Sequence, residues 1–315
     1  MRNLLVAQSG GPTAAINATV AGVVSCAVLS GKVDHIYGAV NGIEGVLAEK
    51  FLDLGKKLDS AEKISLLMQT PAAALGSCRY KLGDPKENTE DFEEILRIFR
   101  RHEIRYFIYI GGNDSMDTVN KLSKYCKENG VEDVFVVGAP KTIDNDLVGT
   151  DHCPGFGSAA KYLAATFAEL ERDCHVYEKK AVTIVEVMGR NAGYIALWCG
   201  IASGAEDILI PERFDGNRPK LENELIESIL EKKALGKKHH LIINAEGVGH
   251  SYGMAKRIEQ ATGVETRASI LGHMQRGGNP TAKDRVYASY MGALAVDLLC
   301  SGATNRVVGY RNGQY

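Results

Sequence analysis

Apolar runs of strand length alternate with helix-length segments through most of the chain, and this alternation restricts the fold. The clearest example is an apolar run at 106–110, a helical segment at about 115–129 and a second apolar run at 133–138. A strand, a helix and a strand at this spacing are typical of the right-handed crossover that joins parallel strands. We therefore predict an α/β fold with doubly wound, mainly parallel sheets.

The same pattern predicts most of the other secondary-structure elements. Further strands are expected at 4–8, 35–40, 181–187, 207–210, 241–245, 267–271 and 306–309. Further helices are expected at about 14–29, 90–102, 157–174, 192–203, 219–235, 252–262 and 281–300. Residues 41–88 show no clear periodicity, so we expect an irregular segment there.

Three of the expected strands end in loops that are rich in glycine or in polar residues. These loops cover residues 9–13, 111–115 and 138–146. Paired glycines allow a ligand to approach the backbone closely, and the amides that open the next helix bind anions. Because ligands of open α/β sheets bind at the carboxyl ends of strands, the three loops together indicate a phosphate and metal site.

The loop at 138–146 contains the side chains best suited to catalysis. Asp144 and Asp146 are two residues apart, so they share one face if the segment is extended. One carboxylate can then accept a proton while the other binds a divalent metal. The alternative is a surface turn whose Asp and Asn side chains cap a following helix.

The composition excludes several other classes of protein. The 315 residues are 45% hydrophobic and 24% charged, as in a soluble globular protein, and the formal net charge is −2. There is no basic field for nucleic acid and no apolar run of membrane-spanning length. None of the seven cysteines forms a C-x-x-C pair, so we expect no zinc site and no disulfide framework, but reduced thiols in a cytoplasmic protein.

Five motifs along the chain form a recognisable set. They are Gly10-Gly11, Gly111-Gly112-Asn113-Asp114-Ser115, Pro140-Lys141-Thr142-Ile143-Asp144-Asn145-Asp146, Met188-Gly189-Arg190 and Leu271-Gly272-His273-Met274-Gln275-Arg276-Gly277-Gly278. In order and spacing the set resembles the 6-phosphofructokinases, essentially from end to end of the chain. The resemblance implies the phosphofructokinase fold of two doubly wound, Rossmann-like lobes. Residues 1–155 plus 275–315 would form the phosphoryl-donor lobe, and residues 156–274 the fructose 6-phosphate lobe.

The resemblance also implies roles for individual residues on the donor side. Asp144 would be the general base for the sugar 1-hydroxyl, and Lys141 and Thr142 would be further catalytic residues at the transferred phosphoryl group. Asp146, together with Asn113, would bind Mg²⁺. The remaining donor-binding residues would be Gly11, Arg79, Gly112, Asp114 and Ser115.

On the acceptor side, the resemblance implies a set of residues that bind fructose 6-phosphate. They are Thr142, Asp144, Met188, Gly189, Arg190, Glu246, Arg267, His273 and Arg276. Arg267 resembles the arginine that reaches the 6-phosphate from a neighbouring subunit, so the resemblance implies a homodimer or homotetramer with an intersubunit active site. The usual companion of this arginine is absent, because Ala181 stands at its position.

Two positions indicate which phosphoryl donor is used. Family members that use ATP have glycines where this chain has Asp114 and Lys141, whereas members that use pyrophosphate have Asp and Lys. An aspartate in place of a glycine crowds and repels the α-phosphate of a nucleotide, while the Lys141 ammonium can neutralise pyrophosphate instead. Thr118, at a position where ATP-using relatives keep a glycine, points the same way. We therefore expect pyrophosphate as the donor, with ATP as the alternative.

Several positions depart from the family pattern. Asn113 replaces a more frequent metal-binding aspartate, which predicts weaker metal binding. Ala21 and Ser25 replace basic residues that bind effectors in regulated members, which predicts little allostery. From Gly193 onward the chain resembles the short ATP-using bacterial members, which indicates a hybrid, and it ends before the last strand and helix of that type.

Two functions other than phosphoryl transfer are alternatives. The departures at Asn113 and Ala181 and the short C-terminus would also fit a non-catalytic subunit that binds sugar phosphates, although Asp144 and Asp146 are retained. An NAD-binding protein is disfavoured, because no G-x-G-x-x-G sequence opens the first helix.

Overall fold

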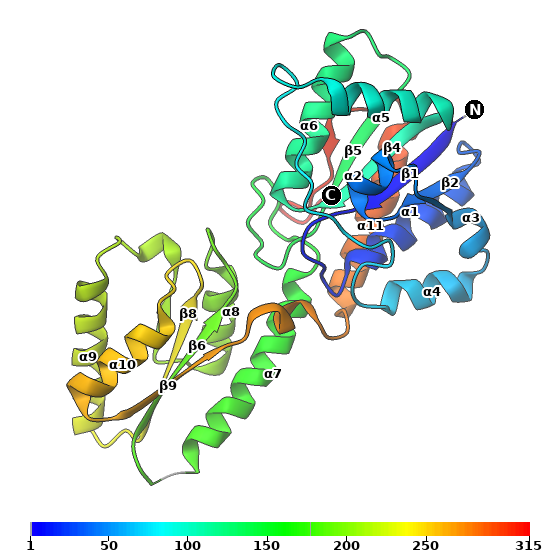
Figure 1. Cartoon of the computed structure of the whole chain (residues 1–315). Coiled ribbons are helices and arrows are strands. Elements are labelled where there is room, and N and C mark those ends of the chain that lie inside the picture. The colour runs from blue at the N-terminus through cyan, green and yellow to red at the C-terminus, as the bar shows by residue number, and fades with distance from the viewer. Residues whose placement is uncertain (1, 177) are drawn as a thin grey trace. The chain divides into compact units, whose positions relative to one another are not determined.

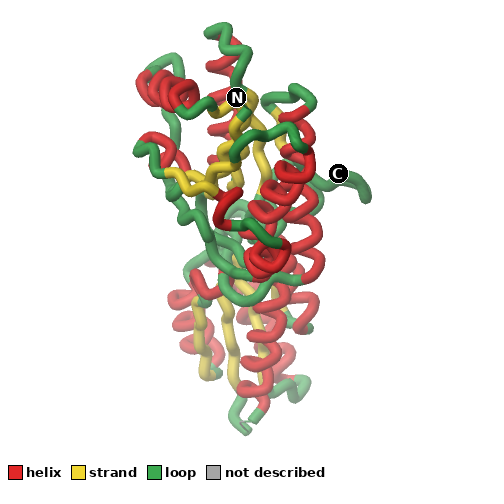
Figure 2. The backbone as a smooth tube through the Cα atoms, turned by 90° about the vertical axis from the view of Figure 1, so that its right-hand side faces the viewer, coloured by secondary structure: helices red, strands yellow, loops and turns green. Residues whose placement is uncertain are grey.

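The computed structural model describes residues 2–176 and 178–315. It divides into two compact units, which are described separately (Figure 1). Unit 1 comprises Met1–Thr142, Leu147–Ser158 and Gly278–Tyr315, and unit 2 comprises Ile143–Asp146 and Ala159–Gly277. Each unit contains strands accompanied by helices, as Figure 2 shows.

The sheet of unit 1 has six strands in the described part of the chain, in the order β10-β5-β4-β1-β2-β3. The strands are β1 (Asn3–Gln8), β2 (Ile36–Ala39), β3 (Phe51–Asp53), β4 (Ile104–Gly111), β5 (Phe135–Pro140) and β10 (Arg306–Val307). Neighbouring strands are parallel except β2 and β3, which are antiparallel. The helices are α1 (Ile16–Ser30), α2 (Gly42–Leu47), α3 (Leu54–Lys57), α4 (Ala61–Gln69), α5 (Glu90–Arg101), α6 (Asn113–Glu128) and α11 (Ala282–Cys300).

Helices cover both faces of this sheet. Leu4 and Val6 of β1 pack in one core with residues of α1 and α11, whereas Leu5 packs in a second core with residues of α5 and α6. Successive side chains of a strand point to opposite faces, so a sheet covered on both sides buries both sets. The central strands are therefore continuously apolar instead of alternating.

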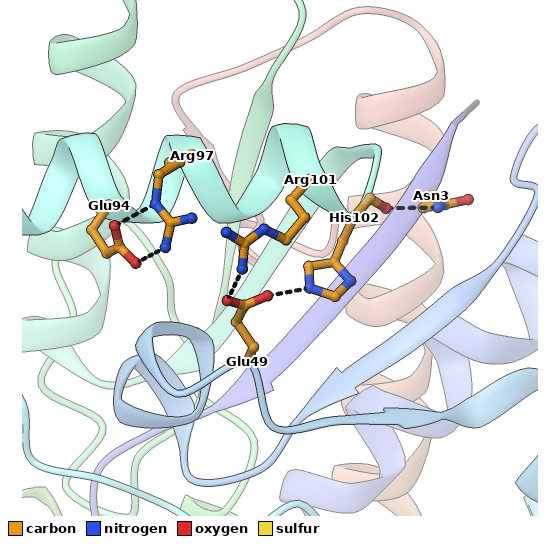
Figure 3. Close-up of polar contacts among 6 residues, drawn as sticks. All are labelled: Asn3, Glu49, Glu94, Arg97, Arg101 and His102. Atoms are coloured by element: carbon orange, nitrogen blue, oxygen red, sulfur yellow. Dashed lines mark hydrogen bonds and ion pairs between the residues drawn. The ribbon is translucent and has the colours of Figure 1, made fainter.

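A group of polar and charged residues connects elements at the amino ends of β1 and β4 (Figure 3). The Glu49 carboxylate accepts a hydrogen bond from Arg101 Nη1 and lies next to His102 Nε2, each at 2.6 Å. The carbonyl of His102 accepts a hydrogen bond of 2.9 Å from Asn3 Nδ2. The hydrogen bond with His102 is the main cause that lowers the pKa of Glu49. These contacts fix the end of α5 against β1, at the opposite end of the strands from the glycine-rich loops.

The sheet of unit 2 is smaller and parallel throughout its described residues, with strand order β7-β8-β6-β9. The strands are β6 (Ala181–Val187), β7 (Asp207–Leu209), β8 (His239–Ala245) and β9 (Glu265–Ile270). The helices are α7 (Phe156–His175), which begins in unit 1, α8 (Tyr194–Ser203), α9 (Arg218–Ala234), α10 (Ser251–Thr262) and the 3₁₀ turns η1 (Pro211–Arg213) and η2 (Gly272–Arg276). Val182 and Ile184 of β6 share a core with residues of α9 and α10.

The structure confirms the predicted class, an α/β fold with mainly parallel sheets. The expectation of an irregular segment at 41–88 is wrong in part, because α2, β3, α3 and α4 lie there. These elements are only three to nine residues long, and α4 has no fully buried residue, so they carry little periodic signal. Within the described residues, no helix is both long and apolar enough to cross a membrane.

Candidate active site

In unit 1, residues 9–13 and 111–115 and the first part of the third loop, residues 138–142, lie side by side at the carboxyl ends of β1, β4 and β5. The Ser9 amide donates a hydrogen bond of 2.9 Å to the Ile110 carbonyl, which connects the first loop to the end of β4. The Lys141 amide donates a hydrogen bond of 2.9 Å to the Gly111 carbonyl, which connects β4 to the third loop. The spatial grouping that the sequence predicted for these loops is therefore present in unit 1 as far as residue 142.

Lys141 extends from the end of β5 to the loop that follows β1. Its side chain is almost fully buried, and its Nζ lies 2.9 Å from the position that a Cβ on Gly10 would occupy. Gly10 has a φ of +76°, a conformation that favours glycine. A larger residue at Gly10 would displace the ammonium. The glycine thus gives a buried cation access to a loop suited to phosphate.

The second loop opens helix α6. A Cβ on Gly111 would lie 1.9 Å from Ser115 Oγ, so only glycine allows Ser115 to pack at the start of this helix. Gly112 is the N-cap residue, and Asn113 and Asp114 occupy the first turn. The backbone amides at this helix start are a favourable position for phosphate oxygens. Asp114 is exposed, and its carboxylate forms an ion pair of 2.9 Å with Lys81 Nζ.

Arg79 lies on a segment of residues 75–82, here called the Arg79 strap, which is bound to the rest of unit 1 on both sides of the arginine. Before it, the Gly10 amide donates a hydrogen bond of 3.0 Å to the Cys78 carbonyl. After it, the Tyr80 hydroxyl donates one of 2.6 Å to Asp91. This hydrogen bond to a carboxylate raises the pKa of Tyr80 to about 12. The exposed Arg79 therefore extends from a backbone that is fixed beside the Gly10 loop.

The segment at 143–146 differs from the extended chain that was expected. Asn145 has a φ of +54°, so the backbone turns between Asp144 and Asp146, and both aspartates are half-buried. The alternative of a helix cap is also wrong, because the next helix, α7, begins only at Phe156. Before the turn, the Thr142 amide donates a hydrogen bond of 3.2 Å to the Pro154 carbonyl. The aspartates thus lie in a structured turn that groups with unit 2, although the chain on both sides of it belongs to unit 1.

In unit 2, the residues expected to bind the sugar lie at the carboxyl ends of β6 and β8. The Glu246 amide donates a hydrogen bond of 2.8 Å to the Val187 carbonyl, and the Gly247 amide donates one of 3.1 Å to Gly189. Gly189 has a φ of +122°, and a Cβ there would lie 2.4 Å from the Ala192 carbonyl oxygen. Met188, Gly189, Arg190 and Glu246 are therefore adjacent on one edge of the sheet.

The turn η2 joins this group through Gln275, for which the sequence predicted no role. The buried Gln275 side chain accepts a hydrogen bond of 3.0 Å from the Met188 amide. This contact brings the turn that carries exposed His273 and half-buried Arg276 next to Met188. The position of Gln275 inside the Leu271–Gly278 motif suggested that it belongs to the site. Nothing in the sequence indicated which backbone group it would bind.

Arg267 of the predicted sugar site lies away from this edge, and so does Ala181, which stands at the position of its absent companion arginine. Arg267 is in the middle of β9, paired in register with Thr183, and forms an ion pair with Glu265. Thr183 precedes Val187 by four residues, which corresponds to about 13 Å along the strand. Ala181 is at the start of β6, farther still from the carboxyl edge. The structure therefore does not bring Arg267 together with Met188 and Glu246 of the same chain.

The predicted metal ligands provide oxygen atoms but do not form a complete cage. Among residues 2–176 and 178–315, no group of three or more His, Cys, Asp or Glu side chains is arranged to hold a metal ion. Mg²⁺ commonly takes one or two protein oxygens and completes its shell with water and substrate phosphates. The carboxylate of Asp146 and the amide oxygen of Asn113 fit this mode of binding in their chemistry.

Comparison with known proteins gives a consistent family. Residues 3–299 match the family model described as phosphofructokinase. The chain is 39% identical over 315 residues to the protein named ATP-dependent 6-phosphofructokinase of Clostridium acetobutylicum, an alignment that covers 100% of this chain and 91% of that protein.

Two solved structures that match the chain are named for pyrophosphate instead of ATP as the phosphoryl donor. The pyrophosphate-dependent phosphofructokinase from Nitrosospira multiformis has a TM-score of 0.85 at 36% identity, and the match covers 96% of this chain and 78% of that one. The pyrophosphate-dependent phosphofructokinase from Marinobacter aquaeolei has a TM-score of 0.82 at 34% identity, covering 96% of this chain and 77% of that one. Similarity alone therefore fits both donors.

Proposed function

The chain belongs to the phosphofructokinase family, and we propose that it transfers a phosphoryl group from pyrophosphate to the 1-hydroxyl of fructose 6-phosphate. The products would be fructose 1,6-bisphosphate and phosphate, in a step of glycolysis. The observation that supports this donor most is the buried Lys141, whose ammonium lies at Gly10 in the first glycine loop.

The choice of donor rests on Lys141 and Asp114. A buried ammonium at the strand ends favours a small polyanion, which it can neutralise in a site of low dielectric. Asp114 lies in the first turn of α6, and the family resemblance implies that its carboxylate would stand near the α-phosphate of a nucleotide. ATP remains the alternative donor, since similarity to named ATP-dependent relatives extends over the whole chain.

We assign the chemical step to the third loop. Asp144 accepts the proton of the 1-hydroxyl as its oxygen forms a bond to the transferred phosphorus, and the bridging P–O bond of pyrophosphate breaks to release phosphate. Lys141 and Thr142 stabilise the transferred group, and Mg²⁺ held by Asp146 and Asn113 would neutralise phosphate charge. Gly11, Arg79, Gly112 and Ser115 complete the donor site of unit 1.

We assign fructose 6-phosphate to the carboxyl edge of the unit 2 sheet. Glu246 can accept hydrogen bonds from sugar hydroxyls, and Met188 and Gly189 offer backbone groups held in place by Gln275 and Gly247. Arg190, His273 and Arg276 supply the donors that a phosphate dianion requires.

A homodimer or homotetramer is also part of the proposal. Helix α8 exposes four large apolar side chains, Tyr194, Leu197, Trp198 and Ile201. Their spacing places them on one face of the helix, and such exposed apolar patches usually mark protein interfaces. An oligomer would cover this face and would allow Arg267 of one subunit to serve the site of another.

The direct test is an initial-rate assay with fructose 6-phosphate and Mg²⁺, comparing pyrophosphate and ATP at equal concentration. Turnover with pyrophosphate and none with ATP is the expected result. Turnover with ATP alone would overturn the assignment of Asp114 and Lys141. Binding of fructose 6-phosphate without turnover from either donor would support the non-catalytic subunit instead.

Replacing the general base gives a second test. Asp144→Asn should lower kcat by about 10²- to 10⁴-fold, because an amide cannot accept the proton. Binding of fructose 6-phosphate, measured by calorimetry, should change little. Asp59→Asn is the matched control, since Asp59 is an exposed aspartate that pairs with Lys63 four residues later, outside the proposed site. An Asp144→Asn enzyme with nearly full kcat would refute the assigned role.

A further inference from the structure

The ion pair between Lys81 and Asp114 connects two parts of the proposed donor site. Lys81 Nζ lies 2.9 Å from Asp114 Oδ1, and the side chains are 69% and 70% exposed. Lys81 belongs to the Arg79 strap, whereas Asp114 begins helix α6. An isolated exposed pair of this kind contributes little to folding stability. The function of the ion pair therefore has to be inferred from the positions in which the backbone holds Lys81 and Asp114.

The backbone is fixed on both sides of Lys81. The preceding residue, Tyr80, is bound to Asp91 through its hydroxyl. The following residue, Leu82, is buried, and its carbonyl accepts a hydrogen bond of 3.0 Å from Lys121 Nζ. Because Lys121 is part of α6, this contact attaches the strap to the helix that carries Asp114. The strap thus presents Lys81 to Asp114 without a large loss of backbone entropy.

The other partner is also held in place. Asp114 lies one turn before Thr118, whose Oγ1 donates a hydrogen bond of 3.1 Å to the Asp114 carbonyl. The start of the helix is fixed by the close packing of Gly111 on Ser115. With both backbones fixed, the ion pair determines the direction of the Asp114 carboxylate more than it determines stability.

A carboxylate at this position poses an electrostatic problem for any polyanionic donor. Arg79 and Lys141 attract phosphate, but an uncompensated Asp114 would repel it. We propose that Lys81 is a positioning residue for donor binding, which acts by pairing with Asp114. The pair holds the carboxylate in one direction and offsets its charge, so that pyrophosphate can bind beside a residue that disfavours nucleotides. This inference rests on the proposed function for the choice of donor.

Replacement of Lys81 should affect donor affinity and not the chemical step. In Lys81→Met, the Kd and KM for pyrophosphate should rise about tenfold, while kcat changes less than about twofold. The increase should shrink as the ionic strength is raised, because salt screens exposed charges. Lys81→Arg should restore most of the affinity. Lys86→Met is the matched control, an exposed lysine on the same connection before α5, and should behave as wild type.

A double-mutant cycle with Asp114→Asn distinguishes this mechanism from a direct contact between Lys81 and the donor. If Lys81 acts through Asp114, Lys81→Met should have no further effect on the pyrophosphate Kd in the Asp114→Asn background. An equal loss of affinity in both backgrounds, or no loss in the single variant, would overturn the proposal. Unchanged urea unfolding midpoints would show that all variants fold.

Failure of the proposed donor would be visible separately. If the wild-type enzyme turns over ATP and not pyrophosphate, the proposed function is wrong in its donor. The same four proteins of the cycle would then be compared by their Kd for ATP. Coupling between Lys81 and Asp114 in that measurement would still support the positioning role, and its absence would refute it.

Discussion

At the scale of single residues, Asp284 is a fully buried carboxylate with several hydrogen-bond partners. Its oxygens accept hydrogen bonds from the Ser158 amide at 2.7 Å and the Ser158 hydroxyl at 2.6 Å, and lie 2.7 Å from His152 Nε2. Burial alone would raise the pKa of Asp284, but the hydrogen bonds from His152 and Ser158 lower it below the ordinary value. The charge therefore stabilises the junction between the start of α7 and the start of α11 in unit 1.

Because its pKa is lower in the folded state, Asp284 contributes stability that is complete above its unfolded pKa and is lost as the pH falls through its folded pKa. Asp284→Asn should therefore destabilise the protein by about 3 kcal/mol near neutral pH, since it leaves buried partners of a charge unmatched. The variant should also lose less stability than wild type on going from pH 5 to pH 3. Urea unfolding across this range measures both effects. Parallel pH profiles of the two proteins would contradict this assignment.

At the candidate site, the sequence predicted residue types better than it predicted contacts. The glycines, Lys141 and the two aspartates were proposed as site residues, because their chemistry is visible in the sequence. The contact between Lys141 Nζ and the Gly10 loop was not, since it depends on which strands are neighbours in the sheet. The turn at Asn145 was also missed, because Asn adopts a positive φ more readily than most residues but does not require it.

At the scale of elements, α1 and α11 pack unusually closely. A Cβ on Gly22 would lie 1.9 Å from the Ser289 carbonyl oxygen, and one on Gly292 would lie 2.2 Å from that of Thr19. Each helix thus uses a glycine where the backbone of the other approaches. This contact brings both helices onto the same face of the sheet, over β1 and β5.

Gly22→Ala should separate the two helices and destabilise the protein by about 1–3 kcal/mol, because backbone atoms cannot move aside as a flexible side chain can. Gly55→Ala is the control, also in a helix, where the nearest atom to a new Cβ is a side-chain oxygen at 3.4 Å. That change should be neutral or stabilise by about 0.5–1 kcal/mol. Chemical denaturation of both variants gives the comparison, and equal stability of the two would argue against the close helix contact.

The long elements were predicted well for a physical reason. Central strands such as β4 are covered on both faces, so they appear as continuous apolar runs, and α5 shows a clear apolar stripe. The short elements at 42–69 were missed because each is only three to nine residues long and because, apart from α2, almost none of their residues are buried. Strand β10 was expected at 306–309 and is only two residues long, since pairing with β5 involves just Arg306 and Val307.

At the scale of the whole molecule, the chain passes more than once between its two compact units. Residues 143–146 group with unit 2, although the residues on both sides belong to unit 1. Asp144 and Asp146 lie on this short passage, whereas Lys141 and Thr142 lie just before it. The sequence order of the motifs gave no indication that residues 143–146 group with unit 2, because unit membership depends on contacts between residues distant in the chain.

The position of Arg267 leads to a prediction about the assembled molecule. Arg267 lies about 13 Å from the carboxyl edge of its own sheet, farther than its side chain can reach toward a sugar bound near Met188. If the proposed oligomer is correct, Arg267 acts on the site of a neighbouring subunit. Arg267→Ala and Asp144→Asn should then each be nearly inactive as pure proteins, for different reasons.

Mixing these two variants after mild dissociation should restore activity. In an isologous pair, one site of each mixed dimer combines an intact Asp144 with an intact Arg267 of the partner, so random exchange should give about one quarter of the wild-type rate. The Asp144→Asn protein alone, dissociated and reassociated in the same way, provides the control. Ile201→Glu on the exposed face of α8 should reduce the recovery if this face forms the contact, which light scattering would show as smaller particles. A mixture that stays inactive although subunits exchange would mean that Arg267 does not complete a neighbouring site.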